Sequence, residues 1–374
     1  ALREAIAQLT SAQVPSATTT AEVLLLHVLK RDRTFLYAHP EAELTYEQEL
    51  DYRALLAERA AGKPTQYLTG RQEFWGLSFQ VEPGVFIPRP ETEHVVELAL
   101  AIVRHGMGRA DARICDVGTG SGCIALALAK ELPEAEIVAV DLSERALAVA
   151  RRNAEALNLA NRVQFLKSDL LQAFFSHHGT AATDFDVRAF DLIVSNPPYV
   201  GRQEAERLPR EVREHEPATA LFSEDEGLAL THRLIDQAAQ LLTGRSSPSS
   251  PAALWGPGFN PAVKGTERSG ASAPEGGPSG GGHWAEHQDA SVVKRSSAGP
   301  GFNPAVRKQE EPRALAPEVT PVAGRRSLVA GWLIIELGYE MVGRVRALLG
   351  EAWTNVEVTS DLRGLPRVLA AQRK

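Results

Sequence analysis

The sequence predicts an α/β fold built on a mostly parallel sheet with helices on both faces. From about residue 112, short apolar runs alternate with helical stretches, as in "ARICDV", "CIALALAKEL" and "EIVAV". The same alternation of an apolar run and a helical stretch occurs near the end, where "WLIIELG" precedes "EMVGRVRALLG". Apolar runs that alternate with helices are typical of strands buried on both faces of a parallel sheet, because the crossover helices cover the sheet.

The first 62 residues predict helices, and therefore a small helical domain ahead of the sheet. Thr19 and Glu22 have the spacing of a capping box before "AEVLLLHVLK". Thr45 and Gln48 repeat that spacing before "ELDYRALLAERA". In such a box the threonine side chain and the residue three positions later satisfy backbone N–H groups at the start of a helix.

The stretch 73–86, "EFWGLSFQVEPGVF", alternates apolar and polar residues around turn-forming ones, which predicts a short hairpin. We therefore expect three segments: a helical domain over 1–72, a hairpin linker over 73–86, and an α/β domain over 87–374. Besides the runs above, the α/β domain is expected to hold a helix at "RALAVARRNAEAL" and strands at "RVQFL", "FDLIV", "NVEVT" and "RVLAAQ".

A segment at about 244–329 interrupts this pattern, because it is rich in Gly, Pro and Ser and has little periodicity. The octapeptide "GPGFNPAV" occurs in it twice, at 256–263 and 299–306, which is too few copies for a solenoid. The composition favours a disordered insertion that is dispensable for stability and turnover. Partner binding through the octapeptide is the alternative, and metal binding by His283 and His287 is disfavoured.

The composition limits the classes of function. A net charge of −7 argues against broad nucleic-acid binding, which depends on surplus Lys and Arg. The two cysteines, Cys115 and Cys123, are expected to be small core residues and favour a reducing compartment. No run approaches the roughly 18 apolar residues of a membrane span, and the first residues lack a signal-peptide pattern. We expect a cytoplasmic protein that is not bound to a membrane.

Three strand ends predict a pocket for an adenosine group. "DVGTGSG", 116–122, lies at a strand-to-helix turn, where glycines let the backbone approach a ligand near the free N–H groups of a helix N-terminus. Asp141 ends the next strand, where it could accept hydrogen bonds from two ribose hydroxyls or, alternatively, cap a helix. The third strand ends at Lys167, before Leu170, where an adenine could lie.

"SNPPYV", 195–200, follows the apolar run "FDLIV". Pro197 and Pro198 must stop that strand, because proline cannot donate to a sheet ladder and has a fixed φ. The residue before a proline is also restricted to extended geometry, which restrains Asn196. The pattern therefore predicts one amide side chain held at the carboxyl edge of the sheet, with Tyr199 close behind it.

The glycine spacing is G-x-G-x-G, which differs from the G-x-G-x-x-G of dinucleotide folds and resembles motif I of S-adenosylmethionine-dependent methyltransferases. Asn196-Pro197-Pro198-Tyr199 resembles the motif of those that methylate a nitrogen conjugated to a π-system. The resemblance implies a Rossmann-like methyltransferase domain, S-adenosyl-L-methionine as cofactor, no metal, and catalytic and substrate-binding roles for these four residues. The cofactor contacts that it implies are Gly118, Thr119, Gly120, Ser121, Gly122, Asp141, Leu170 and Asn196.

"GVFIPRPETE", 84–93, preceded by "YLTGRQEFWGLSF", resembles the HemK/PrmC family, as do "EHEPATAL", 214–221, and "WLIIELG". That family methylates the side-chain amide of the glutamine in the Gly-Gly-Gln motif of class 1 peptide chain release factors. The resemblance implies release factors as partners and a helical domain that recognises them. Arg89 and Glu91 are expected either to close the cofactor pocket or to form an ion pair that holds the hairpin.

Other functions remain open at this stage. A ribosomal-protein glutamine methyltransferase is the nearest alternative. A nucleic-acid adenine methyltransferase uses related motifs but would be expected to carry a basic surface and an added recognition domain. A cofactor-binding module without catalysis is disfavoured by the intact Asn-Pro-Pro-Tyr motif. The chain departs from the family pattern where "LLTG", 241–244, is separated from "WLIIELG" by the extra segment.

Overall fold

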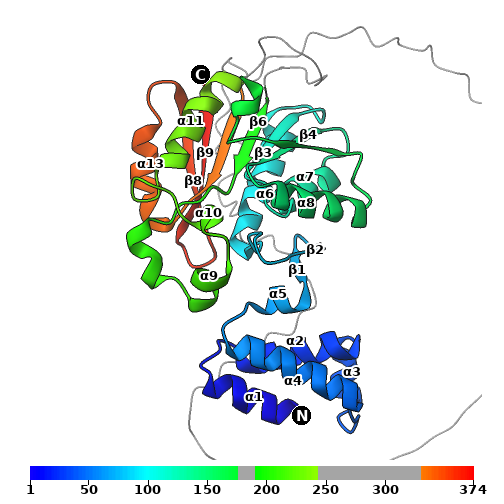
Figure 1. Cartoon of the computed structure of the whole chain (residues 1–374). Coiled ribbons are helices and arrows are strands. Elements are labelled where there is room, and N and C mark those ends of the chain that lie inside the picture. Colours follow the sequence, from blue (N-terminus) through cyan, green and yellow to red (C-terminus); the bar gives the residue numbers. More distant parts are fainter. Residues whose placement is uncertain (176–189, 243–329) are drawn as a thin grey trace, which may run out of the picture. The chain divides into compact units, whose positions relative to one another are not determined.

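The structure, a computed structural model, describes residues 1–175, 190–242 and 330–374 (Figure 1). The segment expected to be an insertion, with its repeated octapeptide and both of its histidines, lies outside the described residues. Its disorder and its dispensability therefore stay predictions.

The N-terminal residues form helices around a small core of their own, as the sequence predicts. Leu9, Leu24 and Leu56 are buried there, and the Tyr52 hydroxyl donates to the Ala21 carbonyl over 2.9 Å. The helices are α1 (Leu2–Ser11), α2 (Ala17–Leu29), α3 (Arg33–Ala38), α4 (Tyr46–Ala60) and α5 (Thr65–Thr69).

One of the two predicted capping boxes is present. The Gln48 N–H donates to Thr45 Oγ1 over 3.2 Å, and the Gln48 side chain accepts from the Thr45 N–H over 3.0 Å. The box predicted at Thr19 is wrong, because α2 already begins at Ala17, after Ser16 in a left-handed conformation. Its proposed partner, Glu22, instead accepts a hydrogen bond from Arg33 in α3.

The predicted hairpin consists of β1 (Arg71–Phe74) and β2 (Leu77–Gln80), which pair antiparallel. Trp75 and Gly76 form its turn, with φ values of 53° and 64°. Positive φ at both turn residues matches the twist of a two-residue hairpin. The Trp75 N–H donates to the Glu93 carboxylate over 2.7 Å, which fastens the hairpin to the first helix of the α/β domain.

The α/β domain contains a seven-stranded sheet with the order β5-β4-β3-β6-β7-β9-β8. Neighbours from β5 to β7 pair parallel, whereas β9 pairs antiparallel with both β7 and β8. The expected mostly parallel sheet is confirmed. Its strands are β3 (Arg113–Val117), β4 (Glu136–Asp141), β5 (Val163–Lys167), β6 (Leu192–Ser195), β7 (Trp332–Glu336), β8 (Trp353–Ser360) and β9 (Pro366–Arg373).

Successive residues of the central strands point to opposite faces of the sheet, and both faces are buried. Ile114 belongs to a core with α6 and α7, whereas its neighbour Cys115 belongs to a second core with α11 and α13. The helices and helical turns are η1 (Pro90–Thr92), α6 (Glu93–Ala101), η2 (Ile102–Gly106), α7 (Cys123–Glu131), α8 (Glu144–Ala156), η3 (Gln172–Phe174), η4 (Arg202–Arg207), α9 (Arg210–His215), α10 (Ala218–Leu221), α11 (Ala229–Leu241), η6 (Tyr339–Met341) and α13 (Val342–Leu348).

Both cysteines are free thiols buried in the core, as the sequence predicts. Cys115 lies in β3 and Cys123 begins α7. Burial raises the pKa of each thiol well above its ordinary value, because the thiolate would be desolvated. Within the described ranges, no helix is long and apolar enough to cross a membrane.

A buried asparagine joins the hairpin to the sheet edge. The Asn153 side chain donates to the Gln80 carbonyl over 3.1 Å and accepts from the Gln80 N–H over 2.7 Å. The same amide donates to the Ser121 carbonyl over 2.9 Å. Asn153 lies fully buried on α8, and its hydrogen bonds join β2 to the glycine-rich loop.

Candidate active site

The predicted site residues follow parallel strands that lie side by side. Val117, the last residue of β3, is in register with Ser195 of β6, and Ser195 with Ile335 of β7. On the other side, Asp141 of β4 is in register with Lys167 of β5. Carboxyl ends of parallel strands meet at one edge of a sheet, so the glycine-rich loop and the Asn-Pro-Pro-Tyr motif occupy the same edge.

The glycines of the predicted motif I adopt the left-handed φ values that favour glycine: 72° at Gly118, 57° at Gly120 and 85° at Gly122. A Cβ added at Gly118 or Gly120 would meet nothing within 4 Å. One at Gly122 would lie 3.1 Å from Leu126 and 3.2 Å from Ala150. The first two glycines therefore leave open space beside the backbone, whereas Gly122 lets the loop approach α7 and α8.

A buried carboxylate supports this loop, and the sequence interpretation missed its role. Asp116 Oδ2 accepts from the Thr119 hydroxyl over 2.7 Å and from the Ala125 N–H over 3.1 Å. Its other oxygen, Oδ1, is buried without a hydrogen-bond partner in the part of the chain that the structure describes. Burial raises the pKa of Asp116 to about 7. Its position as the first residue of the glycine-rich motif could have indicated this role.

Asp141 projects from the end of β4 toward the same loop. Its carboxylate accepts from the Gly120 N–H over 2.9 Å and from the Ser143 N–H over 2.8 Å. Burial raises its pKa, and these two backbone hydrogen bonds oppose that shift. Asp141 does not cap α8, because the Ser143 side chain does so by accepting from the Ala146 N–H over 3.2 Å. The alternative of a helix cap is therefore wrong.

Leu170 lies beyond the end of β5, next to Asp141 on the sheet edge. The Ser168 N–H donates to the Asp141 carbonyl over 3.0 Å, which holds the two strand ends together. Leu170 has a φ of 50° and packs partly buried against the second core. The Leu171 N–H donates to the Gln237 side chain over 2.8 Å. The turn is thus held in place, and a contact from Leu170 to an adenine stays a prediction.

The Asn-Pro-Pro-Tyr motif follows β6, which ends at Ser195 as the two prolines predict. The Ser195 hydroxyl donates to the Val117 carbonyl over 2.7 Å, which joins the motif to the glycine-rich loop. Asn196 is half-buried and its Nδ2 donates to the Thr92 hydroxyl over 3.1 Å. Pro197 is buried and Pro198 half-buried.

Tyr199 is held between two glycines. A Cβ on Gly227 would lie 2.2 Å from the Tyr199 carbonyl oxygen, and one on Gly338 would lie 3.3 Å from the ring. Burial raises the pKa of the Tyr199 phenol, so the hydroxyl is neutral at physiological pH. The motif is therefore rigid at both ends, with Asn196 at one and an aromatic ring at the other.

Arg89 forms an ion pair, but its partner is Glu216 rather than Glu91. The Glu216 carboxylate is buried and also accepts from the Ile87 N–H over 3.4 Å. The Arg89 guanidinium lies 4.9 Å from the centre of the Phe86 ring. Of the two roles expected for Arg89, the structure contains the ion pair, which holds the segment after the hairpin against the one after the Asn-Pro-Pro-Tyr motif. Glu216 was not predicted, although it lies within "EHEPATAL".

A second buried carboxylate, Glu336, ends β7 and was also missed. The Thr92 side chain is hydrogen-bonded to it and lowers its pKa, but burial is the larger effect and raises that pKa to about 7. Its Oε2 atom is buried and has no hydrogen-bond partner among the described residues. The signal was its place in "WLIIELG", where a charged residue directly follows four apolar ones.

These features fit S-adenosylmethionine, which carries a sulfonium and an ammonium charge. Asp116 and Glu336 each have an unsatisfied carboxylate oxygen, and such oxygens favour a cationic ligand. The backbone at Gly118 and Gly120 borders open space. Asp141 supplies a third carboxylate at the strand end beside them. The sheet edge can therefore hold a cationic nucleoside.

The raised pKa of Glu336 predicts a pH-dependent stability. A carboxyl whose pKa rises to about 7 on folding binds its proton more tightly in the folded state, so its contribution is lost as pH rises through about 7. Glutamine cannot ionise, so the Glu336→Gln variant does not lose this contribution to stability as the pH rises. Between about pH 5.5 and pH 8.5 the parent is expected to lose at least about 1 kcal/mol of unfolding free energy relative to the variant.

Urea denaturation at both pH values measures this difference, with Glu351→Gln as a control at an exposed glutamate. Asp116 contributes a similar dependence to the parent and to both variants. The comparison therefore isolates Glu336. A variant that loses as much stability as the parent would show that Glu336 is ionised throughout this pH range.

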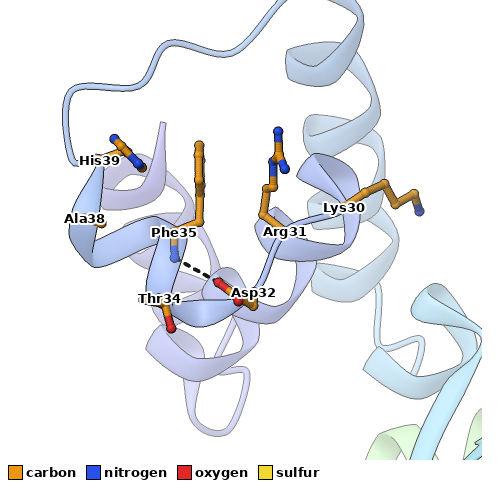
Figure 2. A pocket seen from close by; sticks show the side chains of 7 residues that line it. All are labelled: Lys30, Arg31, Asp32, Thr34, Phe35, Ala38 and His39. Atoms are coloured by element: carbon orange, nitrogen blue, oxygen red, sulfur yellow. Dashed lines mark hydrogen bonds between the residues drawn. The ribbon is translucent and has the colours of Figure 1, made fainter. Parts of the chain in front are cut away.

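A shallow hollow lies elsewhere, in the helical domain at the junction of α2 and α3 (Figure 2). The Arg31 guanidinium lies 5.4 Å from the centre of the Phe35 ring. The centres of the Phe35 and His39 rings lie 4.8 Å apart, with the ring planes tilted by 43°. None of the predicted site residues lines it; the residues that do are Lys30, Arg31, Asp32, Thr34, Phe35, Ala38 and His39. Within the described ranges, no cluster of three or more His, Cys, Asp or Glu side chains could hold a metal ion.

Two family models match successive parts of this chain. Residues 1–70 match the family described as the PrmC N-terminal domain, and residues 77–214 match the methyltransferase small domain. The expected Rossmann-like methyltransferase fold is thereby confirmed. Among solved structures, the catalytic domain of hMettl16 in complex with a 3′UTR hairpin is 16% identical, with a TM-score of 0.45, over 84% of this chain and 81% of that one.

Curated relatives of this chain carry the name release factor glutamine methyltransferase. The protein from Koribacter versatilis is 33% identical over 100% of this chain and 97% of its own length. The protein from Escherichia coli is 43% identical over 64% of this chain and 80% of its own length. Since the first match spans essentially all of both chains, the likeness is not limited to the cofactor motifs. The chain belongs to the release factor glutamine methyltransferase family.

Proposed function

We propose that this protein transfers the methyl group of S-adenosyl-L-methionine to the side-chain amide nitrogen of the glutamine in the Gly-Gly-Gln motif of class 1 peptide chain release factors. The observation that carries the proposal is that Asn196 and the first glycine of the loop, Gly118, each directly follow one of two paired residues, Ser195 and Val117. The Ser195 hydroxyl donates to the Val117 carbonyl. The names of the curated relatives support the same reaction.

The amide nitrogen of glutamine is a poor nucleophile, because its lone pair is delocalised into the carbonyl. It must become pyramidal before it can attack an electrophilic carbon. When bound, S-adenosylmethionine supplies that carbon as a methyl group on a positively charged sulfur. The chain's task is to hold the nitrogen in the reactive geometry, and fixed acceptors aimed at the transition state perform such a task.

Asn196 and Pro197 can supply the acceptors. The Asn196 side-chain oxygen and the Pro197 carbonyl would each accept one N–H of the substrate amide. Both are held in place, because Pro197 is buried and the Asn196 amide is anchored on Thr92. Pro198 stiffens the turn, and the Tyr199 ring would flank the planar substrate group. These four residues are the proposed catalytic and substrate-binding set.

The cofactor contacts are proposed at the neighbouring strand ends. Asp141 would accept from the ribose hydroxyls, and Leu170 would contact the adenine. The glycine-rich loop, Gly118 to Gly122 with Thr119 and Ser121, would border the rest of the molecule together with Asn196. The open space at Gly118 and Gly120 supports this assignment.

Each domain would have a separate role in the reaction. We propose that the helical domain, residues 1–72, recognises the release factor, that 73–86 links it, and that 87–374 carries the methyltransferase activity. The match of residues 1–70 to a family domain of its own supports this division. Because the proposed substrate acts in translation, we expect the enzyme to work in the cytoplasm.

A labelling assay tests the proposal. Cofactor carrying a labelled methyl group is supplied with a folded release factor, its Gln-to-Ala variant, a ribosomal protein that carries exposed glutamines, or duplex DNA. Label is expected in the first substrate alone. DNA should not serve, because flipping a base costs a few kcal/mol and the net charge of −7 offers little to offset it.

Each other result identifies a different enzyme. Label in the ribosomal protein alone would point to the ribosomal alternative. Label in DNA would end the glutamine interpretation, and equal label in both release factors would show that the motif glutamine is not the acceptor.

A further inference from the structure

We propose that Thr92 and Glu336 are positioning residues that hold the Asn196 amide with its oxygen directed to the substrate. The inference rests on the proposed function and concerns how its acceptor geometry is set. An asparagine amide has two ends of nearly equal shape, one that donates and one that accepts. Catalysis by Asn196 requires the accepting end to face the substrate nitrogen, so the chain must prevent the amide from turning over.

The three residues come from separate elements that meet at the sheet edge. Asn196 follows β6, and Glu336 ends the adjacent parallel strand β7. Thr92 lies where η1 passes into α6, and α6 packs on β6, β7 and β9. Thr92 occupies a helix N-cap position, yet its side chain makes no capping hydrogen bond. Its buried hydroxyl accepts from Asn196 instead, and as a hydrogen-bond donor it lowers the pKa of the Glu336 carboxyl.

The Glu336 carboxylate determines the direction of the hydrogen bonds that run from Asn196 through Thr92. Above about pH 7 Glu336 is mostly ionised and can only accept hydrogen bonds, so the single hydrogen of the Thr92 hydroxyl is directed to it. The Thr92 oxygen must then accept from Asn196, and only the NH₂ end of an amide can donate. The structure has this arrangement, with Asn196 Nδ2 donating to Thr92 Oγ1 over 3.1 Å. Oδ1 is therefore left for the substrate.

Burial makes the arrangement costly to break. Thr92 and Glu336 are each 2% exposed, so water cannot readily replace a lost partner. An amide turned over would place its oxygen against the Thr92 oxygen, whose hydrogen is already used, and a buried polar atom without a partner is expensive. The pair can thus select one of the two amide orientations before any substrate binds.

Two substitutions at Thr92 separate a positioning role from a packing role. Thr92→Val keeps the shape but removes the hydroxyl, whereas Thr92→Ser keeps the hydroxyl. The single-turnover rate of Thr92→Val at about pH 8.5 is expected to fall about tenfold, with the KM for the release factor and the Kd for the cofactor within about twofold of the parent values. Thr92→Ser is expected to retain at least about half of the parent rate.

Thr231→Val is the matched control, because Thr231 is a fully buried threonine on α11, outside this network, and the rate of this variant should equal that of the parent.

A low pH provides a further readout. Burial raises the pKa of Glu336 to about 7, so at about pH 6 the protonated carboxyl can donate to Thr92 and the restraint disappears. The tenfold deficit of Thr92→Val should therefore shrink to about threefold or less there. The titratable and charged groups that face Glu336 are Glu91, His94, Cys123, Tyr199 and Arg367.

The outcomes distinguish this inference from the function on which it rests. A parent enzyme that does not label the release factor would refute the proposed function. An active parent with an equally active Thr92→Val variant, or a Thr92→Ser variant as slow as Thr92→Val, would overturn the positioning role alone. If Thr92→Val does not fold, Glu336→Gln replaces it, because its amide can donate to Thr92. The same loss of single-turnover rate is expected at saturating cofactor, with an unchanged KM for the release factor.

Discussion

Replacing Asn196 with alanine is expected to lower the turnover number by about 10² or more, the scale for losing one preorganised group that stabilises a transition state. The substitution removes the acceptor for one N–H of the substrate amide. It also leaves the buried Thr92 hydroxyl without the donor that it has in the parent. Cofactor affinity should change much less, because the glycine-rich loop and Asp141 lie on the neighbouring strand ends.

Single-turnover kinetics with the release factor and calorimetry with the cofactor measure the two effects separately. Asn161→Ala is the control, since Asn161 is exposed in the turn before β5. A fall in cofactor affinity as large as the fall in rate would assign Asn196 to cofactor binding. A variant with the parent rate would remove Asn196 from the catalytic set.

Much of the fold was predictable because the sheet is buried on both faces. Every residue of β7 is buried and all but the last are apolar, so the sequence there is a nearly continuous apolar run. β3 is also fully buried, and its apolar residues are Ile114, Cys115 and Val117. The helices between such strands are equally distinct. The strand that ends at Ser195 was predicted for a different reason, which is that two prolines follow it. These signals are local, and tertiary contacts reinforce them.

The predictions of the fold were wrong or incomplete where two local sequence signals conflict, such as two residues that could each begin a helix. The Thr19 box was wrong because Ser16 and Ala17 begin α2 earlier, so a residue suited to capping lies inside the helix. The short helices α9 and α10 were not predicted, since each is one turn or little more and follows a proline. Neighbouring elements, rather than their own periodicity, hold such turns in place.

The candidate site was predicted where its chemistry is carried by contiguous motifs and missed where it depends on distant residues. Asn196 and the glycines stand in short recognisable patterns. Thr92 contacts Asn196 from 104 residues before it, and Glu336 ends the adjacent strand 140 residues after it, so no local pattern could group them. The same holds for Glu216, which pairs with Arg89 across 127 residues.

Replacing Asp141 with alanine is expected to weaken the binding of S-adenosylmethionine at least tenfold, or about 1.4 kcal/mol. The carboxylate is half-buried, and N–H groups of Gly120 and Ser143 hold it in one orientation. A charged acceptor fixed in this way forms hydrogen bonds worth about 1.5–3 kcal/mol each with ribose hydroxyls. Part of that gain is offset, because the ligand must displace water from the carboxylate.

A modified ligand shows whether the loss comes from the ribose. The parent should bind the cofactor more tightly than its 2′-deoxy analogue, because the analogue lacks one of the hydroxyls that Asp141 would accept from. Asp141→Ala should bind both ligands about equally, since the acceptor is gone. Asp51→Ala, at an exposed site on α4, should retain the parent's preference. If Asp141→Ala still prefers the cofactor as strongly as the parent does, another group holds the ribose, and the lost affinity reflects a glycine-rich loop loosened at Gly120.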